Sequence, residues 1–421
     1  KSECHREERK LGIEVEHMVV EADSFRAVNY YQDEGIEDLL KALVGRNWDP
    51  VTEEGYVIGL ENSDANVSLE PGGQLELSIL PRKTTSELEE IYLNFVREVV
   101  AILDSWDKSL LCIGYQPETC INGIPMVPKQ RYDYMRDHFG DKGKYAYNMM
   151  KATGAMHVNL DFRDEQDYAK KNLVANILSP LVYSVLDNAP FFEGEVNRKP
   201  GLRRKIWENC DEERCGYPSS LFGGDFSYSD YAKYFLSVPP MVYSKDGELV
   251  YSEDKPLEDI LLEDLEPSEE EIEYLLTTIF PDVRTKDHLE IRMGDSLPYP
   301  YNIAYLAFWR GLLYDEANLD NLYERYKRLS SDQFLERKEK LADKGPKAAW
   351  GRETVFSAYR NLPDLADPGL GSGERSKLEP LMELARKEIT PREKTQNLLL
   401  EGEKKALAWC NLTEVIDQEE L

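Results

Sequence analysis

Long hydrophobic runs are missing from this sequence. No stretch approaches the about 18 consecutive apolar residues that cross a bilayer, so we expect no transmembrane helix. The opening decapeptide, KSECHREERK, has no apolar segment of the kind that a secretory signal needs. The sequence therefore predicts a globular protein that carries no visible secretory signal.

Positive charge is scarce. Lysine and arginine together number 51 against 80 aspartates and glutamates, which gives a formal net charge of −29. Proteins that neutralise nucleic-acid phosphates or anionic lipid headgroups need a basic surface. The charge balance therefore argues against nucleic-acid and membrane partners, and a solvated acidic surface explains most of the excess.

Cysteine is also sparse, and its spacing predicts no disulfide framework in a chain of 421 residues. The six cysteines are Cys4, Cys112, Cys120, Cys210, Cys215 and Cys410. Cys210 and Cys215 lie close in sequence, but no second close pair with histidine completes a zinc site. We expect reduced thiols and a cytoplasmic location.

Two common phosphate-binding motifs are absent, since neither G-x-x-x-x-G-K nor a G-x-G-x-x-G after a strand occurs. Short strands interspersed with helices, without regular βαβ alternation, predict an α+β fold. Apolar spacing predicts helices over residues 86–110, 166–190 and 302–314, and one that starts at Ser268. Ser86 and Glu89 fit a capping box for the first of these. From about residue 320 the pattern is helical and charged, with its clearest break at 362–375.

The stretch LGIEVEHMVVE, residues 11–21, alternates apolar and acidic residues. Read as a strand, it places Ile13 and Val15 on one face and Glu14 and Glu16 on the other. Two like charges then lie a few ångströms apart.

Three further segments repeat this pattern of one apolar and one polar face. Their polar faces carry Glu70, Gln74 and Glu76 in SLEPGGQLELSI; His157, Asn159 and Asp161 in GAMHVNLDF; and His288, Glu290 and Arg292 in DHLEIRMGD. For any single strand, exposure of the polar face to water is a sufficient explanation. Taken together, the faces are rich in glutamate, and glycines flank three of the four, which often marks close approach of a ligand.

If these faces converge, they form a strongly anionic site. Neighbouring carboxylates raise one another's pKa unless a cation lies between them. Oxygen ligands with one imidazole suit Mg²⁺ or Mn²⁺. The pattern therefore predicts divalent cations held by the acidic strand faces.

These segments resemble glutamate–cysteine ligase, in the branch shared by plants and many bacteria, within the glutamine-synthetase-like superfamily. The resemblance covers roughly residues 11–315 and rests on ten motifs in the family's order. They are GIEVEH, LEPGGQLELS, GYQP, MVPKQRYDYMRDHF, VNLDF, NAPFFEG, LRRKIW, LSVPPMVY, TTIFPDVRTKDHLEIRMGD and LAFWRGLLYD.

The resemblance implies a curved, mainly antiparallel sheet that forms a funnel-shaped active site with helices outside. We expect this catalytic domain over residues 1–320 and a helical extension packed on it over residues 321–421. The implied reaction is phosphorylation of the γ-carboxylate of glutamate by ATP, followed by attack of the cysteine amine. The implied cofactors are ATP and Mg²⁺ or Mn²⁺, and the implied partners are small-molecule substrates, in a monomer or homodimer.

The resemblance also assigns residues. Its metal ligands match Glu14, Glu16, Glu70, Glu76, His157 and Glu290. His157 stands where some relatives use a metal-binding histidine and plant relatives have glutamine. Arg292 matches the residue that contacts the transferred phosphoryl group of ATP, so Arg292 and Glu290 are the expected catalytic residues. Arg203, Asn159 and Arg131 are the expected substrate-binding residues. Arg203 suits the α-carboxylate of glutamate because a planar guanidinium binds a carboxylate through two hydrogen bonds, and the adjacent Arg204 could exchange roles with it.

Two alternatives to this function stay open. One is a carboxylate–amine ligase of the same fold that uses a different amine in a specialised pathway. The other is a catalytically silent homologue, but that would predict loss of a metal carboxylate or of Arg292, and both are present. The regulatory disulfides of plant enzymes do not map onto Cys210 and Cys215, so no redox switch is expected from the resemblance.

Overall fold

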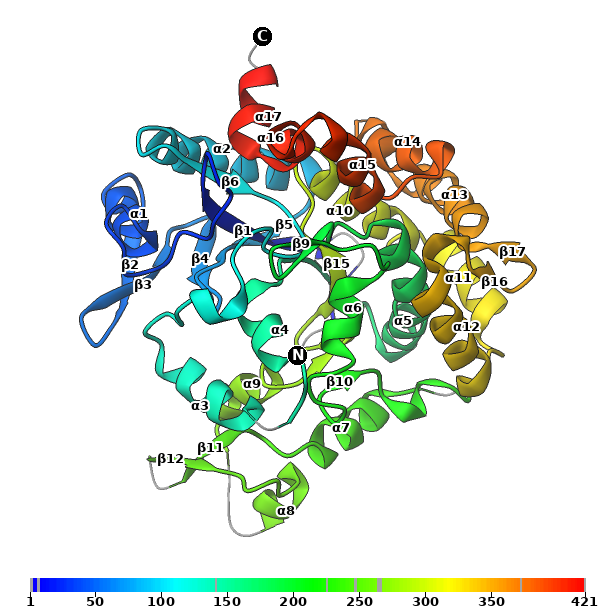
Figure 1. Ribbon diagram of the computed structural model, residues 1–421. Helices are drawn as coiled ribbons and strands as arrows, with labels where there is room; N and C mark the ends of the chain where they lie inside the picture. Colours follow the sequence, from blue (N-terminus) through cyan, green and yellow to red (C-terminus); the bar gives the residue numbers. More distant parts are fainter. Residues whose placement is uncertain are drawn as a thin grey trace.

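The computed structural model of the chain describes residues 3–5, 8–140, 142–224, 226–245, 248–262, 267–371 and 373–419. Within these residues a nine-stranded sheet forms the centre, and helices surround it (Figure 1). The strands follow the order β14-β15-β7-β1-β5-β4-β3-β2, and β6 also pairs with β1. All of these pairs are antiparallel.

The strands of this sheet are β1 (Leu11–Glu21), β2 (Asp49–Glu53), β3 (Tyr56–Glu61), β4 (Ala65–Leu69), β5 (Leu75–Arg82), β6 (Lys108–Leu111), β7 (Ala155–Leu160), β14 (Val283–Thr285) and β15 (Leu289–Asp295). The two-stranded sheets join β8 (Phe191–Phe192) with β9 (Glu195–Val196), β10 (Cys215–Gly216) with β13 (Phe280–Pro281), β11 (Val242–Lys245) with β12 (Glu248–Tyr251), and β16 (Ala349–Trp350) with β17 (Glu353–Thr354).

The helices are α1 (Ile36–Leu43), α2 (Thr85–Asp104), α3 (Gln130–Phe139), α4 (Ala146–Ala152), α5 (Glu165–Val185), α6 (Leu202–Trp207), α7 (Tyr228–Ser237), α8 (Leu257–Leu262), α9 (Glu269–Leu276), α10 (Tyr301–Leu313), α11 (Glu316–Tyr326), α12 (Ser331–Lys344), α13 (Val355–Ala366), α14 (Glu379–Lys387), α15 (Pro391–Leu398), α16 (Glu403–Leu407) and α17 (Leu412–Glu419). Within the described ranges, none of them combines the length and the apolar content that a membrane span requires.

Strand β1 is central because it pairs with three other strands. Its apolar face, with Leu11, Ile13 and Val15, is fully buried in the main core. Full burial of each such side chain contributes about 1.5–3 kcal/mol. Helices α2 and α10 lie against this strand. The buried apolar face therefore forces the glutamates of β1 onto the opposite side of the sheet.

The C-terminal helices complete the core. Helices α13 and α14 pack on α10, while α11 and α13 pack on α5 (Figure 1). One hydrophobic core includes residues from Leu11 to Ile416, and residue 320 lies within α11.

The sequence misplaced the start and the end of the first long helix. Thr84, not Ser86, caps α2, and it forms a capping box with Glu87. The same S/T-x-x-E spacing occurs twice here, and the upstream copy is the one that forms. The helix ends at Asp104 because Asp107 adopts a left-handed conformation (φ 54°), after which β6 joins the sheet. The predicted helix at Ser268 is confirmed, with Ser268 as its cap.

Two other local predictions were wrong. Residues 70–74 form a turn rather than the start of a strand, because Gly73 adopts a positive φ of 87°. The amide of Gln74 therefore donates to the carbonyls of Met150 and Thr153 and leaves the acidic face. The break predicted from residue 362 begins only at residue 367, since Pro363 lies inside α13.

Candidate active site

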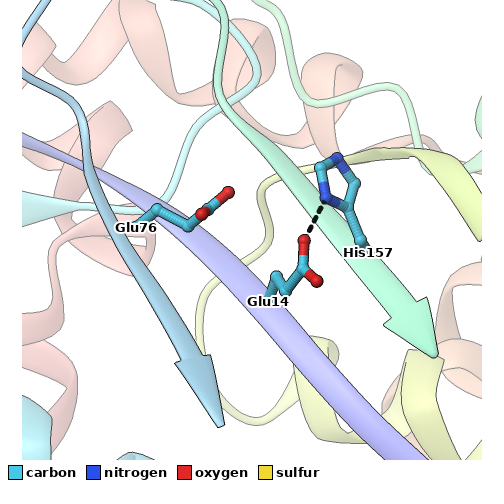
Figure 2. Close-up of side chains that lie close together, drawn as sticks. All are labelled: Glu14, Glu76 and His157. Carbon is cyan, nitrogen blue, oxygen red and sulfur yellow. Dashed lines mark hydrogen bonds and ion pairs between the residues drawn. The ribbon is translucent and has the colours of Figure 1, made fainter. Parts of the chain in front are cut away.

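Strand pairing brings acidic residues and a histidine together on the polar face of the sheet. In the register of β1, Glu16 lies opposite Glu76 of β5, and Glu14 lies opposite His157 of β7. Glu14, Glu76 and His157 each offer one ligand atom, and these atoms lie within 4.8 Å of one another. Figure 2 shows the three side chains extending from three neighbouring strands. Two carboxylates and an imidazole at this separation form a donor set that suits a divalent cation.

Hydrogen bonds hold these side chains in place. His157 Nδ1 lies 2.8 Å from one oxygen of Glu14, and the Asn159 amide donates to the other oxygen at 2.9 Å. Glu76 accepts a hydrogen bond from Ser68 Oγ at 2.8 Å. Glu16 accepts one from the backbone N–H of Ala155 at 2.8 Å.

Burial shifts the acid–base properties of the cluster. It raises the pKa of Glu16 to about 8, with the carboxylate of Glu70 adding to the effect. Burial, and then the carboxylates of Glu14 and Glu70, raise the pKa of Glu76 well above its usual range. Raised pKa values are expected for carboxylates that lie close together without a compensating cation.

Glu14 behaves differently from its neighbours. Burial and the carboxylate of Glu290 raise its pKa, but the hydrogen bond from His157, with the charge of Lys286, outweighs them and holds the pKa at about 2. Burial lowers the pKa of His157, which favours the neutral imidazole. A neutral ring that donates from Nδ1 keeps the lone pair of Nε2 for a cation.

The cluster lines a cavity of about 370 Å³. Its acidic wall consists of Glu14, Glu16, Glu70 and Glu76. Six cationic side chains also line it, namely Lys129, Arg131, Arg203, Arg284, Lys286 and Arg292. A cavity with carboxylates on one side and guanidinium and ammonium groups on the other can hold a cation and anionic ligands side by side.

Glu290 is placed differently from the other expected metal ligands. It is fully buried and contacts Arg284, Lys286 and Arg292, with distances of 2.8 Å to Arg284 and to Lys286. Its nearest approach to His157 Nδ1 is 3.9 Å. The three cations lower the pKa of Glu290 well below its usual range, although burial opposes this. In this arrangement Glu290 holds the arginines of the cavity in position.

Arg203 and Arg292 lie side by side in the cavity wall. Arg203 Nη2 donates to the backbone carbonyl of Arg292 at 3.2 Å. Both guanidinium groups lie over the ring of Trp207, at 5.7 Å and 5.9 Å from its centroid. Such stacking leaves the edges of a guanidinium free for bidentate contacts. Arg204, by contrast, does not line this cavity and pairs with Glu208 at 2.5 Å.

The other two predicted substrate-binding residues differ in placement. Arg131 lines the cavity, where its guanidinium donates to the carbonyl of Thr277 at 3.1 Å and lies over Tyr274. Asn159 lies behind Glu14 and directs its amide to that carboxylate, while its Oδ1 has no hydrogen-bond partner among the described residues.

Among the cavity residues that sequence reasoning missed are the three cations Lys129, Arg284 and Lys286 and the ring of Trp207. A signal for two of them was present. Arg284 and Lys286 precede Glu290 at even spacing, and β14 pairs with β15 so that Arg284 lies opposite Glu290. A hairpin with that register places the charges of both arms on one face.

The segment that leads into α6 is held by the C-terminal region. Asp187 accepts hydrogen bonds from the backbone N–H of Gly201 and from Arg392 Nε, both at 2.9 Å. Gly201 caps α6, and Arg203 is the second residue of that helix. Asp187 and Arg392 are both buried. Arg392, on α15, therefore anchors the helix that presents Arg203.

We expect Arg392→Ala to lower the free energy of unfolding by about 3–5 kcal/mol, because it leaves Asp187 buried without its cationic partner. Chemical denaturation measures this. The control is Arg386→Ala, which removes an exposed ion pair with Glu379 and should change stability little. Equal effects of the two substitutions would contradict the anchoring role.

Comparisons with known proteins agree with this architecture. The fold is that of a ligase from Francisella tularensis, a glutamate–cysteine ligase solved in complex with AMP, at a TM-score of 0.59 and 14% identity, covering 98% of this chain and 88% of that one. A bifunctional glutathione synthetase from Pasteurella multocida gives a TM-score of 0.55 at 11% identity, covering 98% of this chain and 52% of that one. The predicted fold class is confirmed.

Sequence relatives identify the family. The model of glutamate-cysteine ligase family 2 (GCS2) matches residues 10–388. Glutamate–cysteine ligase B, chloroplastic, of Oryza sativa is 34% identical over 358 residues, covering 83% of this chain and 70% of that protein. The chloroplastic glutamate–cysteine ligase of Nicotiana tabacum is 32% identical over 414 residues, covering 94% and 78%. The chain belongs to glutamate–cysteine ligase family 2, as the motifs predicted.

Proposed function

We propose that this protein is an ATP-dependent glutamate–cysteine ligase that joins the γ-carboxylate of L-glutamate to the amine of L-cysteine. The main support for this proposal is that the cluster of Glu14, Glu76 and His157 lies in the same cavity as Arg203 and Arg292. ATP transfers its γ-phosphoryl group to glutamate, giving γ-glutamyl phosphate and ADP. The cysteine amine then displaces phosphate, and the amide product enters glutathione or related thiol synthesis.

The donor set fits Mg²⁺ or Mn²⁺, with Glu14, Glu76 and His157 as ligands and Glu16 and Glu70 at the same cavity wall. Such an ion, when bound, neutralises phosphate charge. Asn159 orients Glu14 by its 2.9 Å hydrogen bond, and Ser68 orients Glu76. Ligand orientation of this kind typically changes metal affinity or activity about 10- to 100-fold.

The two arginines bind different anionic groups of the substrates. Arg292, fixed by Glu290, contacts the phosphoryl group as charge develops on it, whereas Arg203 binds the α-carboxylate that does not react. Arg131, at the cavity wall, contributes to substrate binding, whereas Asn159 does not line the cavity and contributes through its hydrogen bond to Glu14.

We also propose a cytoplasmic location and a monomeric or homodimeric state, without nucleic-acid or membrane partners. All six cysteines are free thiols, which suits a reducing compartment. The names of the plant relatives assign those proteins to chloroplasts.

An amine-acceptor screen tests the reaction. With glutamate and ATP fixed and phosphate release measured, cysteine should give the highest initial rate among cysteine, alanine, serine and 2-aminobutyrate. The preference over 2-aminobutyrate should be modest, because an apolar pocket separates near-isosteres by only about 1–3 kcal/mol. Product with a bulkier or charged amine and none with cysteine would instead indicate a carboxylate–amine ligase of another pathway.

A further inference from the structure

A second, smaller cavity of about 170 Å³ adjoins the acidic one. The two share Arg203, Trp207, Phe280 and Arg292 as lining residues. The arginines and the Trp207 ring therefore stand between the acidic cavity and a pocket whose lining also includes Asp282 and Arg204.

Asp282, which connects β13 to β14, is a buried carboxylate without a partner. Its side chain is 6% exposed, and no residue that the structure describes gives it a hydrogen bond or an ion pair. Burial raises the pKa of Asp282, and the charge of Lys338 on α12 is the first to oppose this, but the ion pair of Lys338 is with Glu208, at 3.3 Å. Leaving a carboxylate buried and unpaired is costly, so a side chain in this state calls for a cationic ligand.

Arg203 is the counterpart of Asp282 in this pocket. It is 4% exposed, and its Nε has no acceptor in the described part of the chain. An unsatisfied guanidinium nitrogen and an unsatisfied carboxylate on the walls of one small pocket match the two charges of an amino-acid zwitterion.

We propose that Asp282 binds the α-ammonium group of the substrate glutamate, whose α-carboxylate lies on Arg203. This inference rests on the proposed function. The γ-carboxylate then extends past Trp207 toward Glu14 and Glu76 in the larger cavity.

Chemistry assigns this ammonium site to glutamate rather than to cysteine. The amine of cysteine is the nucleophile and must lose its proton to attack. A carboxylate that holds an amine as ammonium suppresses that attack. The amine of glutamate takes no part in the reaction, so an ammonium site benefits glutamate alone.

The test compares L-glutamate with glutarate, which has the same carboxylates but no ammonium group. Wild-type protein should bind glutamate about 10- to 100-fold more tightly than glutarate in calorimetry, the usual range for a charge-assisted hydrogen bond. Asp282→Asn should bring this ratio toward unity by weakening glutamate binding alone. Its melting temperature should hold or rise, because an unpaired buried charge has been removed.

The matched control is Asp320→Asn on α11, which makes the same change at an exposed carboxylate paired with Lys170 of α5. It should keep the wild-type ratio. If Asp282→Asn fails to fold, Asp282→Glu retains the charge on a longer side chain and should lower the ratio partially. A ratio unchanged by substitution at Asp282, or the absence of a preference in the wild type, overturns the inference.

Failure of the inference and failure of the proposed function are distinguishable. If glutamate binds with a preference that Asp282→Asn abolishes but no amide product forms with any amine, the proposed function is wrong and the ammonium site stands. If product forms and the preference survives Asp282→Asn, only the role of Asp282 is wrong.

Discussion

Replacing Glu76 by glutamine should reduce ligase turnover by about 100-fold or more while leaving the fold intact. Glu76 is one of three side chains whose ligand atoms lie within 4.8 Å of one another. Loss even of residues that merely orient metal ligands costs about 10- to 100-fold, so loss of a ligand should cost at least as much. Steady-state rates at saturating Mg²⁺ or Mn²⁺ measure the effect.

The same substitution, Glu76→Gln, should not lower the stability of the metal-free protein. Burial and the neighbouring carboxylates raise the pKa of Glu76, which favours its neutral form without metal, so a neutral glutamine should fit this site without loss of stability. The melting temperature without added metal should therefore hold or rise, and its increase on adding Mn²⁺ should shrink. Glu61→Gln, an exposed position at the end of β3, is the control for the same chemical change. Full turnover of Glu76→Gln, or of the wild type in excess chelator, would show that no metal is held here.

Arg292→Lys should lower kcat by about 10²- to 10³-fold, the usual cost of losing one donor to a developing negative charge. Lysine keeps the charge but loses the planar fork. The fold should tolerate the change, because Glu290 retains Arg284 and Lys286 as partners. Rates measured over a range of ATP and glutamate concentrations separate kcat from KM.

Arg203→Ala should instead raise the KM for glutamate by about 10- to 100-fold, as expected for loss of a charge-assisted contact made equally in the ground and transition states. Arg204 neighbours Arg203 but pairs with Glu208 outside the acidic cavity. Because Arg204 lines the smaller pocket proposed for glutamate, the control outside both cavities is Arg386→Ala, which removes an exposed ion pair with Glu379 and should leave that KM unchanged. Equal effects of Arg203→Ala and Arg292→Lys on the KM for glutamate, with kcat unchanged, would refute this division of roles.

Strand periodicity predicted much of the candidate site. Alternation in LGIEVEHMVVE and in GAMHVNLDF places Glu14, Glu16 and His157 on the polar faces of their strands, and the structure confirms this because the apolar faces are buried. The prediction failed for Gln74, which lies in a turn with a left-handed glycine, Gly73, just before β5 begins. A single positive φ changes which face the next side chain occupies, and sequence alternation alone does not reveal it.

The surroundings of Glu290 show why the alternation of polar and apolar residues did not predict what each polar residue does. Its place beside Arg292 on β15 was predictable from the spacing of two residues. Arg284 and Lys286 also contact Glu290, and these contacts depend on the hairpin of β14 and β15. The register of the two strands decides which charged residues lie opposite one another.

From the order of its residues alone, this chain reveals its family, its α+β character and the acidic faces of its strands, because these follow from local periodicity and from motifs. Long-range packing decided the rest. Pairing of β1 with β5 and β7 chose which carboxylates meet His157. The contacts of Arg392 and Gly201 with Asp187 fix the start of α6, which places Arg203 in the cavity wall. The burial of the Asp282 carboxylate without a hydrogen-bond partner was also invisible in the sequence. It depends on which residues the folded chain places around that pocket.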